Sequence, residues 1–234
     1  MQTMTYSMQG GVDVNIPKEA SEIIERLTAA GFEAYAVGGC VRDALMGRTP
    51  KDIDVATNAL PVQIKNVFSD CVINTKGEKY GCISVKTPMG RTVEITTFRS
   101  EGDYADHRHP RLVHFVQTIE EDLARRDFTI NALAYNEQRG LVDIFGGERD
   151  IRDRRIACIG DADARFGEDA LRMLRALRFA SELDFEIDSS VEKSIHKNHD
   201  LISFVPRETL HNEMERIMRG TGAKRLFEQF RDII

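Results

Sequence analysis

The spacing of apolar and polar residues divides this chain into a mixed first part and a helical second part. Apolar positions recur at helical spacing in "PKEASEIIERLTAAG", which predicts a helix over residues 17–30. Short apolar or alternating runs bounded by glycine and polar residues predict strands. The strands are expected at 32–39, 51–57, 71–76, 80–87 and 91–99, and short helices at 40–47 and 60–68.

The pattern changes after residue 99. Residues 100–111, "SEGDYADHRHPR", have no apolar period and predict a loop. The chain after residue 119 is predicted to be mainly helical, apart from an extended piece at 140–145. The strongest helical pattern covers residues 168–185, and further helices are expected at 189–201, at 206–219 and from 222. The pattern therefore predicts an α+β fold, in which a mixed-sheet unit is joined near 146–160 to an all-helical unit.

Composition limits the class of protein. The chain has 234 residues, with 41% hydrophobic and 30% charged residues, as in an ordinary globular protein. It has no apolar run of about 20 residues, so we expect no membrane partner. Four widely spaced cysteines without a CxxC pair argue against a zinc site and against a disulfide framework, and favour reduced thiols and a cytoplasmic location. The net charge of −6 argues against a basic nucleic-acid coat protein but leaves room for a local basic groove.

The first candidate chemistry is a pair of carboxylates, Asp52 and Asp54, in "TPKDIDVAT". Residues two apart in a strand project from the same face, so the two groups should lie close together and repel each other. A divalent cation would relieve that repulsion, and carboxylate oxygens suit Mg²⁺. Taken alone, the pair is better explained as the solvated acidic edge of a strand.

The segment "VGGCVRD" just upstream changes this balance. Gly38 and Gly39 lie at a predicted strand-to-helix turn, where glycine permits unusual backbone angles and close approach of a ligand. The start of the following helix offers free N–H groups to an anion, and Arg42 adds a positive charge. A phosphate-binding turn next to a pair of acidic residues is more specific than either feature alone.

Three segments together resemble one family. "VGGCVRDALMGRTPKDIDVATNALP" is similar to the signature of the class II tRNA nucleotidyltransferase and bacterial poly(A) polymerase family. "RRDFTINALAYN" at 125–136 resembles its second motif, and "RFGEDALRMLRALRFASEL" at 165–183 resembles its nucleotide-selecting motif. The resemblance runs from about residue 20 to 220, with the motifs in the family's order. It implies a polymerase-beta-like nucleotidyltransferase head followed by an all-helical neck.

The resemblance implies a reaction and a site. In that reaction the 3′-hydroxyl of a nucleic acid attacks the α-phosphate of a nucleoside triphosphate and pyrophosphate leaves, with Asp52 and Asp54 binding two Mg²⁺ ions. Glu94 is either a third catalytic carboxylate or a salt-bridged strand residue. The triphosphate would be bound by the residues of the two glycine- and arginine-containing motifs: Gly38, Gly39, Arg42 and Arg126. Asp127 and Asn131 could equally be capping or structural residues.

The resemblance assigns nucleotide selection to Asp169 and Arg172. An acceptor and a donor side by side match the amino group and the ring acceptor of cytosine and of adenine, whereas uracil and guanine present the opposite order. The alternative is an ordinary pair within one helix, worth about 0.2–0.5 kcal/mol. Arg175 and Arg178 continue the arginine series on the side of the helix opposite its apolar stripe. We expect these arginines either to face solvent or to bind a nearby polyanion, with the nucleotide as the candidate ligand.

Within the family, the segment "NTKGEKYGCISV" favours a CCA-adding enzyme over a poly(A) polymerase. The A-adding enzyme is the next alternative, and the CC-adding enzyme is disfavoured because "EGDYADHRHP" resembles the flexible loop that it lacks. ATP, CTP and the tRNA 3′ end are the expected partners, and no protein partner is predicted. A catalytically incomplete nucleotide-binding or regulatory module is the alternative of another class. A nucleic-acid scaffold is disfavoured by the low aromatic content, 7%.

The expected domains are a catalytic head at 1–150, a neck at 151–215 and the start of a helical body at 216–234. Because family members continue well beyond this point, we expect the chain to bind nucleotide and Mg²⁺ but to extend tRNA weakly or not at all. Full-rate CCA addition by the chain would contradict that expectation.

Overall fold

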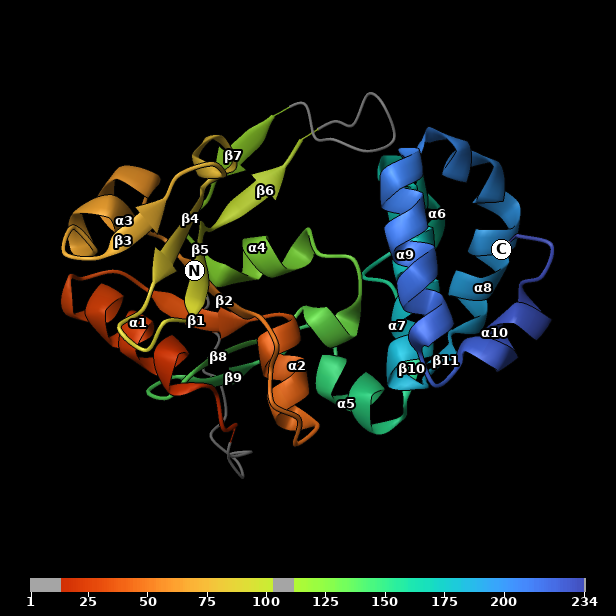
Figure 1. Cartoon of the computed structure of the whole chain (residues 1–234), viewed down its shortest axis with the longest axis horizontal. Helices are drawn as coiled ribbons and strands as arrows, with labels where there is room; N and C mark the ends of the chain where they lie inside the picture. Colours follow the sequence, from red (N-terminus) through yellow and green to blue (C-terminus); the bar gives the residue numbers. More distant parts are fainter. Residues whose placement is uncertain (1–13, 103–111, 234) are drawn as a thin grey trace, which may run out of the picture.

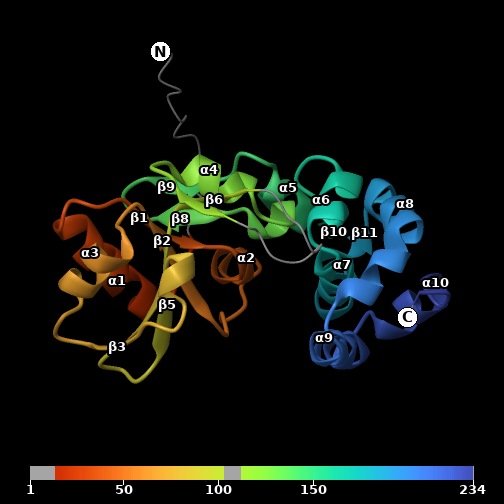
Figure 2. The same ribbon diagram turned by 90° about the horizontal axis from the view of Figure 1, so that it is seen from above.

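The structure is a computed structural model, and it describes residues 14–102 and 112–233. A mixed α/β part, coloured red to green in Figure 1, lies beside a helical part coloured teal to blue. The view from above in Figure 2 shows the same two parts side by side, with α5 and α6 at their junction. No helix within the described ranges is both long and apolar enough to cross a membrane.

The first part is built on one seven-stranded sheet with the order β3-β4-β5-β2-β1-β8-β9. Strands β2 and β5 run parallel and the other neighbours run antiparallel, which makes the sheet mixed and confirms the predicted fold class. The strands are β1 Ala34–Val37, β2 Ile53–Thr57, β3 Val72–Asn74, β4 Cys82–Lys86, β5 Thr92–Thr97, β8 Ala134–Asn136 and β9 Gly140–Val142. A separate two-stranded ribbon pairs β6 Arg99–Glu101 with β7 Val113–Phe115.

Helices cover the two faces of this sheet unequally. On one face α1 and α3 pack on Ile53 and Val55 of β2 and on the apolar residues of β4 and β5. On the other face Ala56 contributes to a smaller cluster with Ile119 and Leu123 of α4. Because side chains alternate along a strand, Asp54 projects toward this second, less covered face. The helices of the first part are α1 Lys18–Ala29, α2 Gly39–Leu45, α3 Pro61–Val67, η1 Glu78–Tyr80, α4 Ile119–Ala124, η2 Thr129–Asn131 and α5 Gly147–Arg152.

The second part is a small helical domain around α7, whose residues are buried along nearly their whole length. Its helices are α6 Ala162–Glu168, α7 Leu171–Leu183, α8 Ser189–Asn198, η3 His199–Phe204, α9 Arg207–Arg219 and α10 Ala223–Gln229. A short parallel pair, β10 Arg155–Ile156 and β11 Glu186–Ile187, closes its lower end. Phe128 and Ile130 of the first part belong to the same apolar cluster, so the two parts share a core at their junction.

Several predicted elements differ from the observed ones. The helix expected over 168–185 is shorter, because α7 runs from Leu171 to Leu183 and Glu168 is the last residue of a separate helix, α6. The region after residue 119 contains β8, which was expected to be helical and instead pairs with β1. Part of the predicted loop at 100–111 is strand, since β6 extends to Glu101, and residues 103–111 of that loop lie outside the described residues.

Candidate active site

Two carboxylates lie opposite each other on neighbouring parallel strands. Asp54 of β2 is the direct register partner of Glu94 of β5. Asp54 is half-buried and Glu94 is exposed, and both alternate with fully buried apolar residues that hold the strands against the core. Asp52, predicted as a strand residue, lies in a bend one residue before β2 and is exposed. The structure therefore brings Asp54 and Glu94 together and places Asp52 at the adjoining edge.

The position of Asp54 disfavours its charged form. Burial raises the pKa of the Asp54 carboxyl to about 6, and the negative charges of Glu94 and Asp52 add to the rise. The positive charge of Arg126 acts in the opposite direction and only partly offsets these effects. A buried carboxylate that is repelled by two others is a group that a bound cation would stabilise.

Gly38 forms the turn between β1 and α2 and adjoins Arg126. Its φ of 68° lies in the region that favours glycine, and its N–H donates to the carbonyl of Leu133 at 2.9 Å. A Cβ atom on Gly38 would lie 3.0 Å from Nη1 of Arg126. Arg126 also influences Asp54 electrostatically, so the turn, the arginine and the carboxylate form one site.

Arg126 is held by a buried carboxylate, Asp122 of α4. Asp122 accepts a hydrogen bond from Nη2 of Arg126 at 3.0 Å and from Nη2 of Arg125 at 2.9 Å. Arg125 also pairs with Glu101 of β6 at 2.9 Å. Nε of Arg126 is buried and has no hydrogen-bond partner among the described residues. Such a donor is a candidate for contact with a ligand atom.

Arg42 of α2 lies deeper, at the junction with the helical part. Its Nη1 donates to Oδ1 of Asn131 at 2.7 Å, and its Nε and Nη2 donate to Oδ1 of Asp43 at 2.9 and 2.7 Å. Asn131 in turn donates to Asp127 at 3.4 Å. The sequence left several roles open for Asp127 and Asn131; in the structure Asn131 holds Arg42, Asp127 holds Asn131, and neither caps the helix η2.

Asp169 occupies the break between α6 and α7. Its backbone is extended, and its Oδ1 accepts a hydrogen bond from the N–H of Leu171 at 3.0 Å. The prediction that Asp169 lies within a continuous helix was wrong, because a short acidic side chain satisfies the free N–H groups of a helix start. Asp169 and Arg172 remain close, since the N–H of Arg172 donates to the carbonyl of Asp169 at 3.0 Å.

Arg172 is buried, 6% exposed, and connects the helical part to the segment that carries Arg126. It pairs with Glu168 at 2.6 Å, and its Nη2 lies 3.5 Å from the carbonyl oxygen of Arg125. Arg165 of α6 donates to the carbonyl oxygen of Ala124 at 2.9 Å. The start of α7 is thus docked on the residues next to Arg126.

The other two arginines of α7 bind protein carboxylates. Arg175 pairs with Asp127 at 2.6 Å, and Arg178, which is 4% exposed, pairs with Glu213 of α9 at 2.6 Å and with Glu182 at 3.2 Å. Of the two alternatives for this arginine series, the solvated face is wrong for Arg172 and Arg178, which are buried. Glu168 and Glu182 neutralise part of this series from four residues away along the chain, and Asp127 and Glu213 neutralise the rest from distant elements, which a pattern along one helix cannot reveal.

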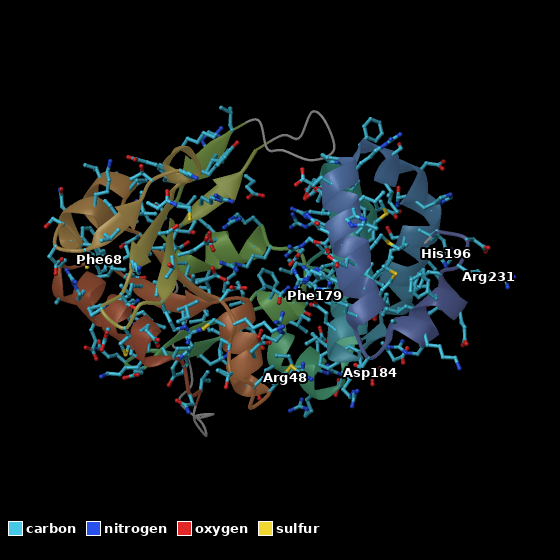
Figure 3. The ribbon with its side chains drawn as sticks, viewed as in Figure 1. Arg48, Phe68, Phe179, Asp184, His196 and Arg231 are labelled. Carbon is cyan, nitrogen blue, oxygen red and sulfur yellow. The ribbon has the colours of Figure 1, made fainter. Side chains whose placement is uncertain are left out.

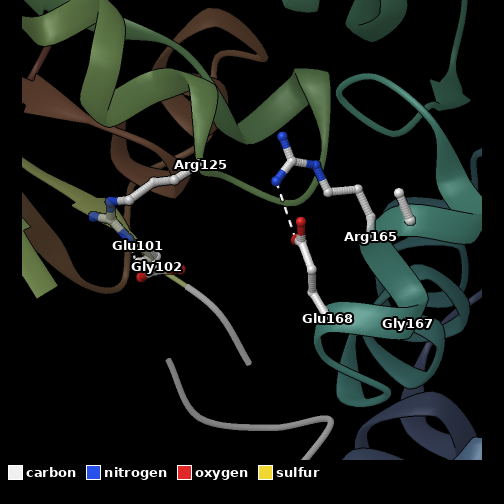
Figure 4. A pocket seen from close by; sticks show the side chains of 7 residues that line it. Glu101, Gly102, Arg125, Arg165, Gly167 and Glu168 are labelled. Atoms are coloured by element: carbon white, nitrogen blue, oxygen red, sulfur yellow. Dashed lines mark hydrogen bonds and ion pairs between the residues drawn. The ribbon is translucent and has the colours of Figure 1, made fainter. Parts of the chain in front are cut away.

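An open pocket of about 440 Å³ lies between the two parts. Figure 4 shows Arg125 and Glu101 on one side and Arg165 and Glu168, joined by an ion pair of 3.1 Å, on the other. Asp52, Asp54 and Glu94 are not among its lining residues. The pocket therefore borders Arg125, the neighbour of Arg126, and does not include the carboxylates.

Oxygen donors at this site fit a divalent cation. Within residues 14–102 and 112–233, no three His, Cys, Asp or Glu side chains form a ready ligand set. Asp52 and Asp54 are left as two carboxylates, which matches a hard cation that completes its coordination with water and substrate phosphates. The raised pKa of Asp54 fits the same reading, because a cation would supply the missing positive charge.

Comparison with known proteins identifies the family. Residues 34–157, more than half of the chain, match the family model described as the poly A polymerase head domain. The chain belongs to this family. Residues 184–233 match a second model, described as a probable RNA- and SrmB-binding site of polymerase A. The head match covers β2, β5 and Arg126, and ends before α6, so Asp169 and Arg172 lie between the two matched segments.

The similar proteins are CCA-adding enzymes. The chain is 44% identical over 212 residues to one from Lactobacillus delbrueckii subsp. bulgaricus, covering 91% of this chain and 53% of that protein. It is 46% identical over 206 residues to one from Geobacillus thermodenitrificans, covering 88% of this chain and 50% of that protein. The chain thus spans about half the length of the curated relatives it matches.

Solved structures show the same fold. The Bacillus stearothermophilus CCA-adding enzyme in complex with CTP matches with a TM-score of 0.83 and 41% identity, over 92% of this chain and 51% of that one. The Thermotoga maritima CCA-adding enzyme complexed with tRNA matches with a TM-score of 0.75 and 25% identity, over 94% of this chain and 52% of that one. The resemblance inferred from the three motifs is confirmed, and so is the nucleotidyltransferase fold of the head.

Proposed function

We propose that this chain forms the catalytic head and the nucleotide-selecting neck of a tRNA nucleotidyltransferase. It selects CTP and ATP without a nucleic-acid template and adds CMP and AMP to the 3′ end of tRNA. One observation carries the proposal. Arg172 reaches the carbonyl of Arg125, while the next residue, Arg126, adjoins Gly38 and acts on Asp54, so base selection and phosphate chemistry meet at one segment.

The residues of the head would bind and orient the triphosphate. Gly38 and Gly39 let the phosphates approach the backbone, and Arg126 offers its buried Nε together with its charge. Arg42 provides a second cation whose orientation is fixed by Asn131 and Asp43. These contacts would hold the α-phosphate in line for attack by the 3′-hydroxyl of tRNA, with pyrophosphate as the leaving group.

Asp52 and Asp54 would hold Mg²⁺, and Glu94 would act beside them as a further carboxylate. When bound, Mg²⁺ lowers the pKa of the attacking hydroxyl and neutralises charge on the phosphates. Asp54 is mostly ionised when a cation is bound or when the pH lies above its raised pKa. The positive charge of Arg126 also favours the ionised form. The residue types fit Mg²⁺ because all the available donors are oxygen atoms.

Asp169 and Arg172 would read the base. The carboxylate of Asp169 accepts from the amino group of cytosine or adenine, and the guanidinium of Arg172 donates to the adjacent ring nitrogen. Uracil and guanine would leave a buried polar group unpaired, which a site of this kind rejects. Arg175 and Arg178 stay outside this set, because their guanidinium groups pair with Asp127, Glu182 and Glu213.

The test is extension of three tRNAs that end before CCA, after the first C, and after CC, with labelled CTP or ATP and Mg²⁺. Stepwise addition to all three supports CCA addition, and incorporation only after CC assigns the A-adding activity. A variant with Asp52→Asn and Asp54→Asn should abolish transfer, and Asp200→Asn on the exposed surface should not. ATP or CTP binding without transfer to any of the three tRNAs would favour either the nucleotide-binding module or, as the sequence leads us to expect, a head and neck that do not hold tRNA by themselves. Because tRNA is the proposed substrate, we expect a cytoplasmic location.

A further inference from the structure

Three guanidinium groups surround the ring of Phe179 at the junction of the head and the neck. Cζ of Arg178 lies 4.1 Å from the ring centroid, Cζ of Arg42 lies 5.3 Å away, and Cζ of Arg175 lies 5.4 Å away. Two of these arginines are on α7 itself, but Arg42 comes from α2 of the head. Figure 3 labels Phe179 at this junction, between the helices of the head and α7. A cation that approaches an aromatic face is attracted to it, most strongly where water is excluded.

A hydrogen-bonded route connects the same two elements. Nη1 of Arg42 donates to Asn131 at 2.7 Å, Asn131 donates to Asp127 at 3.4 Å, and Asp127 pairs with Arg175 at 2.6 Å. Burial alone would oppose the charge on Asp127, but Arg175 and the N–H of Phe128 outweigh it and hold the pKa below its ordinary value. Asp127 is therefore ionised and fixed at neutral pH.

These contacts define the orientation of Arg42 from three sides. Asp43 accepts from Nε and Nη2, Asn131 accepts from Nη1, and Phe179 presents its ring at 5.3 Å. Only Asp43 is a neighbour in sequence. The other two contacts depend on α7, directly through Phe179 or indirectly through Arg175, so the neck helps to set where the guanidinium of Arg42 points.

We propose that Phe179 and Arg175 are positioning residues for the phosphate-binding arginine Arg42. The inference rests on the proposed function, in which Arg42 binds the triphosphate. α7 begins just after Asp169 and carries Arg172 one turn before Arg175 and two turns before Phe179. One rigid helix thus sets both the base-reading pair and the phosphate contact. Arg175 acts through Arg42 and not as a ligand of the nucleotide.

The experiment measures binding of inorganic tripolyphosphate to the full chain by calorimetry. Phe179→Leu removes the aromatic face and keeps an apolar side chain, so we expect tripolyphosphate to bind about tenfold more weakly. In an Arg42→Gln background, Phe179→Leu should cause no further loss. The matched control is Phe230→Leu, a fully buried residue of the same core cluster, which should leave binding unchanged. An equal loss from Phe179→Leu in both backgrounds, or no loss in the wild type although Arg42→Gln itself weakens binding, would overturn the proposal.

A second readout does not depend on ligand binding. Relaxation of the Arg42 Nε–H signal by NMR, assigned by its absence in Arg42→Gln, reports how rigidly the side chain is held. Phe179→Leu should make this group mobile, and Phe230→Leu should not. If Arg42→Gln leaves tripolyphosphate binding unchanged, the phosphate role of Arg42 is wrong, and this signal alone decides the positioning role. If Phe179→Leu does not fold, Arg175→Gln supplies the same comparisons. An Arg42 side chain that stays rigid in Phe179→Leu, or in Arg175→Gln where that variant replaces it, refutes the inference.

Discussion

The raised pKa of Asp54 makes a prediction about stability. Burial in β2 raises the pKa of this carboxyl to about 6, with further contributions from Glu94 and Asp52. In the unfolded chain the same group ionises near 3.8. The protein therefore folds around a carboxylate that would be more stable in water. Replacing Asp54 by the uncharged isostere Asn should stabilise the folded chain in the absence of metal.

The magnitude follows from the displacement of the pKa. The pKa of Asp54 is about two units higher in the folded chain than in the unfolded chain, which corresponds to about 3 kcal/mol of folding free energy. Because the folded pKa lies above the unfolded one, the contribution of Asp54 to stability is fully present below about pH 4 and is lost as the pH rises through about 6. We therefore expect Asp54→Asn to raise the free energy of unfolding by about 3 kcal/mol near pH 8, and the gain to vanish near pH 4.

The assay is urea-induced unfolding followed by circular dichroism at several pH values, with and without Mg²⁺. Bound Mg²⁺ stabilises only the folded state, so it should raise the midpoint of the wild type and leave that of Asp54→Asn unchanged. Asp200→Asn serves as the control, because the Asp200 side chain is 95% exposed. Equal stability of Asp54→Asn and wild type near pH 8 would refute the reasoning about this site.

Two further predictions concern other parts of the chain. Gly38→Ala should abolish nucleotide binding, measured by calorimetry, because the φ of 68° is unfavourable for alanine and the new Cβ would lie 3.0 Å from Nη1 of Arg126. The control Gly90→Ala should bind nucleotide normally, because Gly90 also has a positive φ, 85°, but no atom of the described residues beyond its chain neighbours lies within 4 Å of its Cβ position. Asp163→Asn should lower the thermal midpoint of the chain, because Lys197, Ser194 and Asn198 hold the pKa of Asp163 at about 2 and so stabilise the fold. The decrease in the thermal midpoint should be present above about pH 4 and disappear as the pH falls toward 2. A decrease that does not depend on pH would contradict this prediction.

The parts of the site that follow from local pattern were predictable from sequence. Asp54 was recognised because it interrupts an apolar strand, and Gly38 because two glycines precede a helix. The break at Asp169 was missed, since the apolar positions of "GEDALRMLRAL" begin only at Ala170 and do not fix where the helix starts, and an acidic residue can either cap a helix or lie within it. The strand β8 was missed because three residues are too few to establish an alternation.

The contacts across the junction could not be predicted in this way. Phe179 falls among the apolar residues of α7 and looks like ordinary core, and nothing in its local spacing indicates that Arg42, far away in sequence, faces its ring. The partners of Arg175 and Arg178 are likewise distant, on the segment of Asp127 and on α9. Such pairings depend on how the head and the neck pack, which a periodic pattern within one element does not specify.

The central claim is that the protein itself selects the nucleotide, and equilibrium binding of the four triphosphates in the presence of Mg²⁺ tests it most directly. We predict that CTP and ATP bind at least about tenfold more tightly than UTP and GTP, because the latter leave Asp169 or Arg172 unpaired. Asp169→Asn should remove this preference while tripolyphosphate binding is retained. Equal affinity for all four nucleotides, or a preference that survives Asp169→Asn, would contradict the account.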